Sequence, residues 1–224
     1  MVLLGGKPYA DRGQAAQRLC ESLAVYETEQ PVILGIPRGG VVIADAIARE
    51  LNAHLDIVLT RKLGAPGNPE LAIGAVAENG EVYIQGQIAG RVGADDRYIE
   101  QERARQLEEI RARRQRYRAV LPRVPLRERT VILTDDGIAT GATMQASIWA
   151  AREEEPSLIV VAVPVGSQDA VERLEQEADE VICPCIPEYF YAIGQFYTDF
   201  SQVSDEEVLE ILRAHRRRTG ENGP

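Results

Sequence analysis

The stretch VILTDDGIATGAT, residues 131–143, decides the fold class of this 224-residue chain. A β-branched apolar run at Thr130–Thr134 predicts a buried strand, and two adjacent acids, Asp135 and Asp136, follow directly after it. A loop of small and hydroxyl residues then leads into an alanine-rich helix that ends near Arg152. A loop of this kind, placed before a helix N-terminus, offers backbone N–H groups to an anion.

The loop and the two acids favour different parts of a ligand. Gly137 and Gly141 allow close approach of the backbone, and Thr140 and Thr143 add hydroxyl donors, so the loop suits a phosphate. Carboxylates oppose an anion but accept hydrogen bonds from a sugar diol. Ribose 5-phosphate has both an anionic phosphate for the loop and a diol for the two acids. The alternative is that the acids only cap a strand–helix joint, but such a joint would not also require Thr-Gly-x-Thr. A Walker nucleotide loop is excluded, because Gly-Lys-Ser/Thr is absent here.

Strands and helices alternate outward from this stretch. This alternation predicts an α/β fold with a mostly parallel sheet covered on both faces. Asn79-Gly80, between Ala72–Ala77 and Val82–Ile84, predicts a hairpin and one antiparallel strand within that sheet. The other expected strands are Val32–Ile36, His54–Thr60, Leu158–Val165 and Glu180–Cys183, and the other expected helices are 11–24, 41–51, 94–121, 167–178 and one that begins at Ser204.

Composition limits the function classes. The chain is 45% hydrophobic and 27% charged, which is typical of a globular protein, and no run approaches the ~20 apolar residues of a membrane span. The N-terminus lacks a signal-peptide pattern, so we expect a cytoplasmic protein without a membrane partner. The net charge of −10 disfavours general nucleic-acid binding, although Arg97–Arg129 holds eleven arginines against five glutamates. Three cysteines and two histidines lack the spacing of a disulfide framework or a zinc site.

Residues 131–143 resemble the phosphoribosyl-pyrophosphate (PRPP) signature of type I phosphoribosyltransferases, which joins a hydrophobic strand, two acids, Thr-Gly and a following Thr. The resemblance implies a three-layer α/β/α fold, with a mostly parallel sheet that has one antiparallel strand, plus a small hood. It implies a single domain over residues 1–224, with its core at about 25–184. The hood would come from the N-terminal segment and about 185–224, and the long Arg-rich helix would span about 94–121.

The resemblance also implies roles for residues of the signature. Asp135 and Asp136 would act as the catalytic pair that holds the ribose hydroxyls. The ribose 5-phosphate loop would comprise Gly137, Ile138, Ala139, Thr140, Gly141, Ala142 and Thr143. Mg²⁺ is the implied cofactor, reached by Asp135 and Asp136 only indirectly through ribose and water, with no direct ligand assigned.

Two further segments resemble pyrophosphate-binding parts of the same family. The strand–helix turn would contribute Pro37, Arg38, Gly39 and Gly40, and the Pro37–Arg38 peptide bond is the candidate for a cis bond. Arg61 and Lys62 resemble a basic pair that holds pyrophosphate, although a solvated basic turn explains the dipeptide equally well. We expect the segment Gly64–Pro69 to be poor in regular structure, and it fits the family's mobile loop.

The implied activity is transfer of ribose 5-phosphate from PRPP to a nitrogenous acceptor, with release of pyrophosphate. Ala139 stands where enzymes of the hypoxanthine-guanine type carry Asp, which disfavours a 6-oxopurine acceptor. Tyr189, Phe190 and Tyr191 are candidates to stack on a base, and packing of the hood on the core is an equal alternative. The family resemblance suggests a homodimer.

Two other function classes were weighed. A non-catalytic nucleotide- or PRPP-sensing regulatory protein of the same fold stays open, with the Arg97–Arg129 region as its nucleic-acid surface. A hydrolase is disfavoured because the chain lacks G-x-S-x-G and a His-centred dyad.

Overall fold

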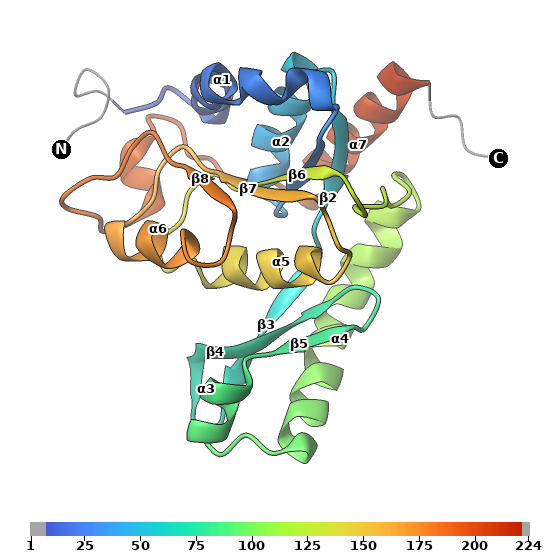
Figure 1. Cartoon of the computed structure of the whole chain (residues 1–224). Helices are drawn as coiled ribbons and strands as arrows, with labels where there is room; N and C mark the ends of the chain where they lie inside the picture. The colour runs from blue at the N-terminus through green and yellow to red at the C-terminus, as the bar shows by residue number, and fades with distance from the viewer. Residues whose placement is uncertain (1–7, 221–224) are drawn as a thin grey trace.

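A five-stranded parallel sheet forms the centre of the protein, in a computed structural model that describes residues 8–220 (Figure 1). Its strand order is β2-β1-β6-β7-β8, and every neighbouring pair is parallel. The strands are β1 Val32–Gly35, β2 His54–Ile57, β6 Thr130–Thr134, β7 Leu158–Ala162 and β8 Glu180–Ile182. The inner strands β1 and β6 are buried along their whole length, which explains their continuous apolar sequence.

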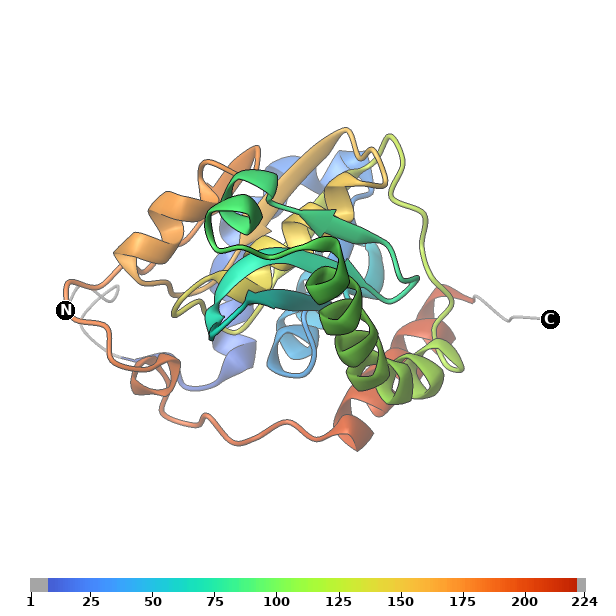
Figure 2. The same ribbon diagram turned by 90° about the horizontal axis from the view of Figure 1, so that it is seen from below.

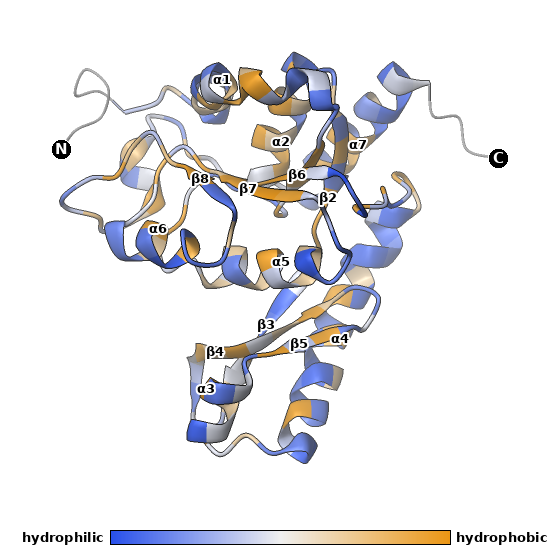
Figure 3. Ribbon diagram, viewed as in Figure 1, coloured by the Kyte–Doolittle hydropathy of each residue, from blue (hydrophilic) through white to orange (hydrophobic). Residues whose placement is uncertain are grey.

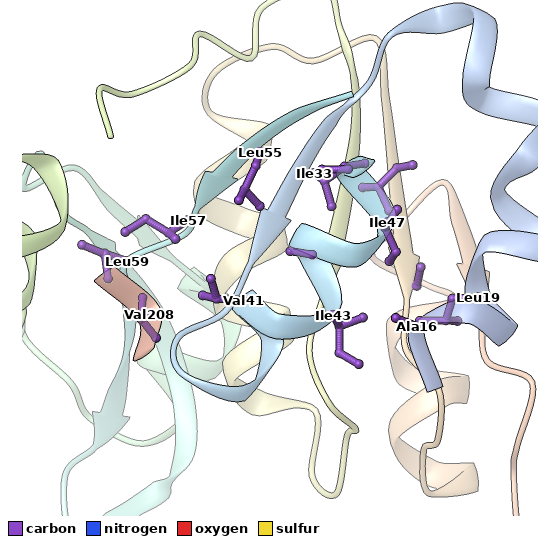
Figure 4. Close-up of a cluster of buried hydrophobic side chains, with 14 of the residues drawn as sticks. Ala16, Leu19, Ile33, Val41, Ile43, Ile47, Leu55, Ile57, Leu59 and Val208 are labelled. Carbon is purple, nitrogen blue, oxygen red and sulfur yellow. The ribbon is translucent and has the colours of Figure 1, made fainter. Parts of the chain in front are cut away.

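Helices cover both faces of this sheet, which confirms the three-layer α/β/α expectation. One face carries α1 Arg12–Leu23, α2 Gly39–Glu50 and α7 Asp205–Thr219, and the other carries α5 Ala142–Arg152 and α6 Gln168–Leu174. Apolar side chains of α1, α2 and α7 meet those of β1 and β2 in a continuous core (Figure 4). The apolar sides of α2 and of the sheet face each other, whereas the outer surfaces are hydrophilic (Figure 3).

A second sheet projects beyond α5. It is antiparallel, in the order β3-β4-β5, and consists of β3 Thr60–Ala65, β4 Asn68–Ala77 and β5 Val82–Ile84. The hairpin expected at Asn79-Gly80 is confirmed, and Gly80 has a φ of 89°. The expectation that the antiparallel strand lies within the parallel sheet was wrong. The chain leaves that sheet after Ile57, and β3 pairs with its sequence neighbour β4 instead.

The segment Gly64–Pro69 is also more regular than expected. It forms the ends of β3 and β4, joined by a turn at Pro66-Gly67 in which Gly67 has a φ of 73°. Proline fixes a backbone φ suited to the first turn position, and glycine readily adopts the left-handed φ of the second. The expectation of a segment poor in regular structure was therefore wrong, since Pro-Gly makes a tight hairpin turn here.

The Arg-rich segment forms one long helix, α4 Asp96–Arg118, which lies against the antiparallel sheet together with the short helix α3 Gly86–Arg91 (Figure 2). Most of α4 is hydrophilic, and its buried residues include Ile110 and Tyr117. The helix therefore packs on the second sheet through a narrow stripe of buried residues, and its other side chains face outward. Across residues 8–220, no helix is both long enough and apolar enough to span a bilayer.

The N-terminal end of the described chain pairs with the segment around residue 197. The Tyr9 N–H donates to the Phe196 carbonyl at 2.8 Å, and the Thr198 N–H donates to the Tyr9 carbonyl at 2.7 Å. Two 3₁₀ helices, η2 Ala24–Glu29 and η3 Ile193–Phe196, lie in these regions. The assignment of the N-terminal segment and residues from about 185 to one hood stays a prediction.

Candidate functional site

The candidate site lies where β1 and β6 end side by side. After β1 the chain enters α2 on one face of the sheet, and after β6 it enters α5 on the other face. Ligands of open α/β sheets bind at such a point, because the diverging connections leave a crevice outside the carboxyl ends of the strands.

A cavity of about 610 Å³ opens at this position. It brings together five of the residues that the sequence singled out, from three separate segments: Pro37, Arg61, Lys62, Asp135 and Thr143. The cavity therefore combines a carboxylate, a helix N-terminus and two cationic side chains.

The two acids diverge although they are adjacent in sequence. Asp135 lines the cavity, and its Oδ1 accepts a hydrogen bond of 2.8 Å from the Asp136 N–H. Burial raises the pKa of Asp135 well above its usual value, and the neighbouring Asp136 carboxylate raises it further. Asp135 is thus held in place by backbone but is electrostatically costly to ionise.

Asp136 points instead toward Arg12, the first residue of α1. Asp136 Oδ2 lies 2.8 Å from Nε and 2.8 Å from Nη2 of Arg12. The Asp136 carbonyl accepts a 2.7 Å hydrogen bond from the Tyr197 hydroxyl. Burial raises the pKa of Asp136, while the hydrogen bond and the charge of Arg12 lower it.

Sequence reasoning missed Arg12. Its only local signal is a positive charge in the first turn of a helix, where the helix dipole disfavours cations. Such a side chain needs an anionic partner elsewhere, but nothing in the sequence points to one 124 residues away.

The loop from Gly137 to Thr143 is braced through its carbonyl groups. The Ser167 hydroxyl donates to the Ala139 carbonyl at 2.6 Å, and Arg173 Nη1 donates to the Thr140 carbonyl at 2.7 Å. Gly141 caps α5 with a φ of 71°, so glycine is required there. The first N–H groups of α5 have no partner within the helix, and only a long 3.4 Å hydrogen bond joins the Ala142 N–H to Thr140 Oγ1, so this helix start suits an anion.

The turn after β1 reaches the same site. The Pro37–Arg38 peptide bond is cis, as the family resemblance suggested, and Pro37 lines the cavity. A Cβ on Gly40 would lie 2.7 Å from the Thr134 carbonyl oxygen, so glycine lets α2 begin directly against β6. A Cβ on Gly39 would overlap Asp136 Oδ2. Arg38 caps α2 and is half-buried, but it does not line the cavity.

The wall opposite the strands is formed by α4, which the sequence had not placed there. Glu102, Arg105, Gln106, Glu109 and Arg113 line the cavity from this helix. Glu102 accepts hydrogen bonds from Arg105 at 2.6 and 2.9 Å, and these lower its pKa. Arg61 Nη2 lies 3.2 Å from Glu109 Oε2, so α4 also partly neutralises the basic pair. The inner face of the Arg-rich helix therefore belongs to the site.

The candidate aromatic residues are not brought to this cavity. Tyr189 and Tyr191 are 61% and 85% exposed, and Phe190 packs on Phe196 with ring centroids 5.3 Å apart. None of the three lines the cavity that contains Asp135.

Magnesium is the cofactor that the family resemblance implies for this cavity. No group of three His, Cys, Asp or Glu side chains that could hold a metal occurs within residues 8–220. Asp135 offers carboxylate oxygens, which Mg²⁺ prefers, and Mg²⁺ commonly completes its shell with water and substrate phosphates. The residues present therefore fit an ion that arrives with a diphosphate.

Comparison with known proteins decides the family. The phosphoribosyl transferase domain matches residues 9–201 of the chain. The chain belongs to the phosphoribosyl transferase family. A Mycobacterium tuberculosis H37Rv protein named "Putative phosphoribosyl transferase Rv0571c" is 42% identical over 211 residues, which cover 94% of this chain and 48% of the relative. This family member thus spans about half the length of the curated relatives it matches.

A solved structure agrees with this family membership. The crystal structure of TT1426 from Thermus thermophilus has a TM-score of 0.89 and 49% sequence identity. The match covers 92% of this chain and 98% of TT1426, so the two share most of their fold.

Proposed function

We propose that this protein transfers ribose 5-phosphate from PRPP to a nitrogenous acceptor, with Mg²⁺ as cofactor and release of pyrophosphate. The observation that carries the proposal is the shared cavity: Asp135, the N-terminus of α5 at Thr143, and the basic pair Arg61 and Lys62 all line it. A carboxylate for the sugar hydroxyls, amides for the terminal phosphate and cations for the diphosphate are the three features that PRPP requires.

In the proposed reaction the bond between the anomeric carbon and the pyrophosphate oxygen breaks, and a bond to the acceptor nitrogen forms. The transition state has oxocarbenium character, as in glycosyl transfer generally. Asp135 orients the ribose through its hydroxyls, and the amides from Ala139 to Thr143 anchor the 5-phosphate. Arg61 and Lys62 stabilise the charge that develops on the departing pyrophosphate. Bound Mg²⁺ would offset further negative charge on the diphosphate.

The acceptor is the open half of the reaction. The cavity wall that faces Asp135 is polar and comes from α4, with Arg105, Gln106 and Glu109 among its residues. The exposed Tyr189 and Tyr191 therefore give little support to an aromatic acceptor clamp. Ala139 continues to disfavour a 6-oxopurine, because it offers no carboxylate to a ring nitrogen.

The experiment that tests the function has two arms. Calorimetric titration of the protein with PRPP and Mg²⁺ measures binding, and a panel of bases and amines tests turnover through pyrophosphate release. We expect saturable PRPP binding, and pyrophosphate release with at least one acceptor. Asp135→Asn should weaken binding at least about tenfold, which corresponds to about 1.4 kcal/mol. Absence of PRPP binding by the unaltered protein would refute the proposal.

The alternative of a non-catalytic sensor makes a distinct prediction in the same experiment. A sensor would bind PRPP or a nucleotide yet release no pyrophosphate with any acceptor. A nucleic-acid surface on α4 has less support, since Arg103, Arg105 and Arg111 each pair with a glutamate three residues earlier. Such pairing offsets the positive charge that phosphate binding would need.

A further inference from the structure

The helix α4 turns one polar face toward the cavity. The polar residues of this face that line the cavity are Glu102, Arg105, Gln106, Glu109 and Arg113. Positions 102, 106, 109 and 113 follow one another at intervals of three or four residues, and such positions share one side of an α-helix. Two arginines, at positions 105 and 113, therefore meet a cavity that is proposed to bind an anionic substrate.

The two arginines differ in how far their charge is offset. Arg105 donates two hydrogen bonds to Glu102, at 2.6 and 2.9 Å. Arg113 has Ile110, rather than a glutamate, three residues before it. Its ion pair among residues 8–220 is a long one, with 3.9 Å between Arg113 Nε and Asp205 Oδ1. Arg113 is therefore the cation of this helix face with the weaker partner.

Arg113 lies at the end of the cavity where the diphosphate is expected. Arg118 Nη2 donates to the Ile57 carbonyl at 3.0 Å, so the C-terminal end of α4 sits at the end of β2 (Figure 1). Arg113 precedes Arg118 by five residues, or about 7.5 Å along the helix. The turn that contains Pro37 starts at the same end, because β1 pairs with β2 in parallel and Gly35 stands opposite Ile57.

The residues predicted to hold the diphosphate leave a place for this arginine. Arg38 was expected to face the diphosphate, but it does not line the cavity. Arg61 lines the cavity, but its Nη2 lies 3.2 Å from Glu109 Oε2, which offsets part of its charge. A guanidinium suits the remaining charge of a diphosphate, because its N–H groups match two phosphate oxygens at once.

We propose that Arg113 binds the diphosphate of PRPP, as was expected of Arg38, and that Arg61 exchanges its contact with Glu109 for the same group. This inference rests on the proposed function. It adds a substrate-binding role for the Arg-rich helix, whose inner face then serves the leaving group of the reaction.

Both arginines can leave their present partners without stranding a buried charge. Arg113 and Arg61 are 41% and 44% exposed, and Glu109 is 58% exposed. Asp205 would keep its hydrogen bond from the Tyr117 hydroxyl at 2.5 Å. Exposed ion pairs contribute little free energy, so a diphosphate competes with them effectively.

Calorimetric titrations test the proposal with three ligands, each in the presence of Mg²⁺: inorganic pyrophosphate, PRPP and ribose 5-phosphate. Arg113→Gln should bind pyrophosphate and PRPP at least about tenfold more weakly, because a charge-assisted hydrogen bond to phosphate is lost. The same variant should bind ribose 5-phosphate as the unaltered protein does, since that ligand lacks the diphosphate. Glu109→Gln should act in the opposite direction and bind pyrophosphate about two- to fivefold more tightly, because it removes an exposed competing ion pair.

Arg114→Gln is the matched control. Arg114 is adjacent to Arg113, and its Nε also lies 3.9 Å from a carboxylate oxygen, Oε2 of Glu78. However, Arg114 lines a separate groove of about 410 Å³ on another side of α4. The control variant should bind all three ligands as the unaltered protein does. If circular dichroism shows that Arg113→Gln does not fold, Arg113→Met replaces it and keeps the apolar stem of the side chain.

The outcomes separate the inference from the function on which it rests. If the unaltered protein binds PRPP and the folded Arg113 variant binds it equally well, or loses affinity for ribose 5-phosphate to the same extent, the inference is wrong. Unchanged or weaker pyrophosphate binding by Glu109→Gln would refute the exchange at Arg61. If the unaltered protein binds pyrophosphate but not PRPP, the proposed function fails, and the Arg113 variant still decides whether α4 binds the diphosphate. If it binds neither ligand, both fail.

Discussion

Asp135 combines a proposed functional role with a cost in stability. Its folded-state pKa is raised, so the folded protein holds a proton there more readily than the unfolded chain does. The stability that this carboxyl contributes is complete below its unfolded pKa of about 3.9 and is lost as pH rises toward the folded value. A site that must present a buried carboxylate therefore destabilises the fold at neutral pH.

This cost predicts that Asp135→Asn stabilises the protein while it weakens PRPP binding. The amide oxygen can still accept the hydrogen bond from the Asp136 N–H. Thermal unfolding at several pH values should show a gain that grows as pH rises above the unfolded pKa of about 3.9 and levels off above the raised pKa, at about 1.4 kcal/mol for each unit between the two. A variant less stable than the unaltered protein at pH 8 would contradict the assignment of a raised pKa to Asp135.

Gly39 gives a second prediction at the level of one residue. A Cβ there would overlap Asp136 Oδ2 and lie 3.1 Å from Arg12 Nε, so Gly39→Ala must displace the ion pair. Such overpacking should cost about 1–3 kcal/mol in denaturant unfolding. Gly86→Ala is the matched control, because nothing lies within 4 Å of its Cβ position. Equal stability of the two variants would show that the side chains around Asp136 can move aside to make room for the added methyl group.

The sequence allowed the acids and the loop at 137–143 to be predicted, because their spacing is local. It did not reveal the Arg12–Asp136 pair, which depends on how two remote segments fold together. It also could not separate Asp135 from Asp136, since adjacent acids look alike until their surroundings are known.

At the scale of elements, α4 is fastened to both sheets by one buried arginine. Arg118 Nε lies 3.0 Å from each carboxylate oxygen of Glu78 in the turn after β4, and Nη1 contacts Asp56 in β2. Its Nη2 donates to the Ile57 carbonyl at 3.0 Å. Since α4 also lines the cavity, this cluster sets one wall of the candidate site.

We therefore expect Arg118→Ala to destabilise the protein by about 3–5 kcal/mol, because it leaves the buried Asp56 carboxylate without a counter-charge and leaves Glu78 only a 3.9 Å contact with Arg114. Arg111→Ala on the same helix removes only an exposed pair with Glu108 and should change stability by less than about 0.5 kcal/mol. Urea unfolding of both variants measures the difference. Similar values for the two would mean that the cluster does not hold α4 in place.

Elements with local signals were predictable. Ser204 and Glu207 form the capping box that opens α7, Asp11 caps α1, and Asn79-Gly80 turns the hairpin. The Pro66-Gly67 turn was missed because it was interpreted through the resemblance as a mobile loop, although Pro-Gly is itself a turn signal. The position of α4 over the cavity depends on Arg118 and its distant partners, so it had no local signal.

At the scale of the molecule, the two sheets should differ in local stability. β6 and β7 are buried and paired on both sides, whereas β5 is a half-buried edge strand followed by the short helix α3. Hydrogen exchange should therefore be slowest in residues 131–134 and 159–162 and much faster in residues 82–91. Equal protection of both regions would show that the antiparallel unit unfolds only with the core.

The layered architecture was predictable because alternating strands and helices allow few arrangements. The separation of a second sheet was not, since the run His54–Thr60 suits a single strand and carries no sign that the parallel sheet ends at Ile57 and a new strand begins at Thr60. Pairing of β3 with β4 through the tight turn at Pro66-Gly67 forms the second sheet instead.

A crystal structure of the protein soaked with PRPP and Mg²⁺ tests the central claim most directly. We expect the 5-phosphate at the amides of residues 139–143 and the ribose hydroxyls on Asp135. PRPP bound elsewhere, or a sugar that makes no contact with Asp135, would contradict the proposed site.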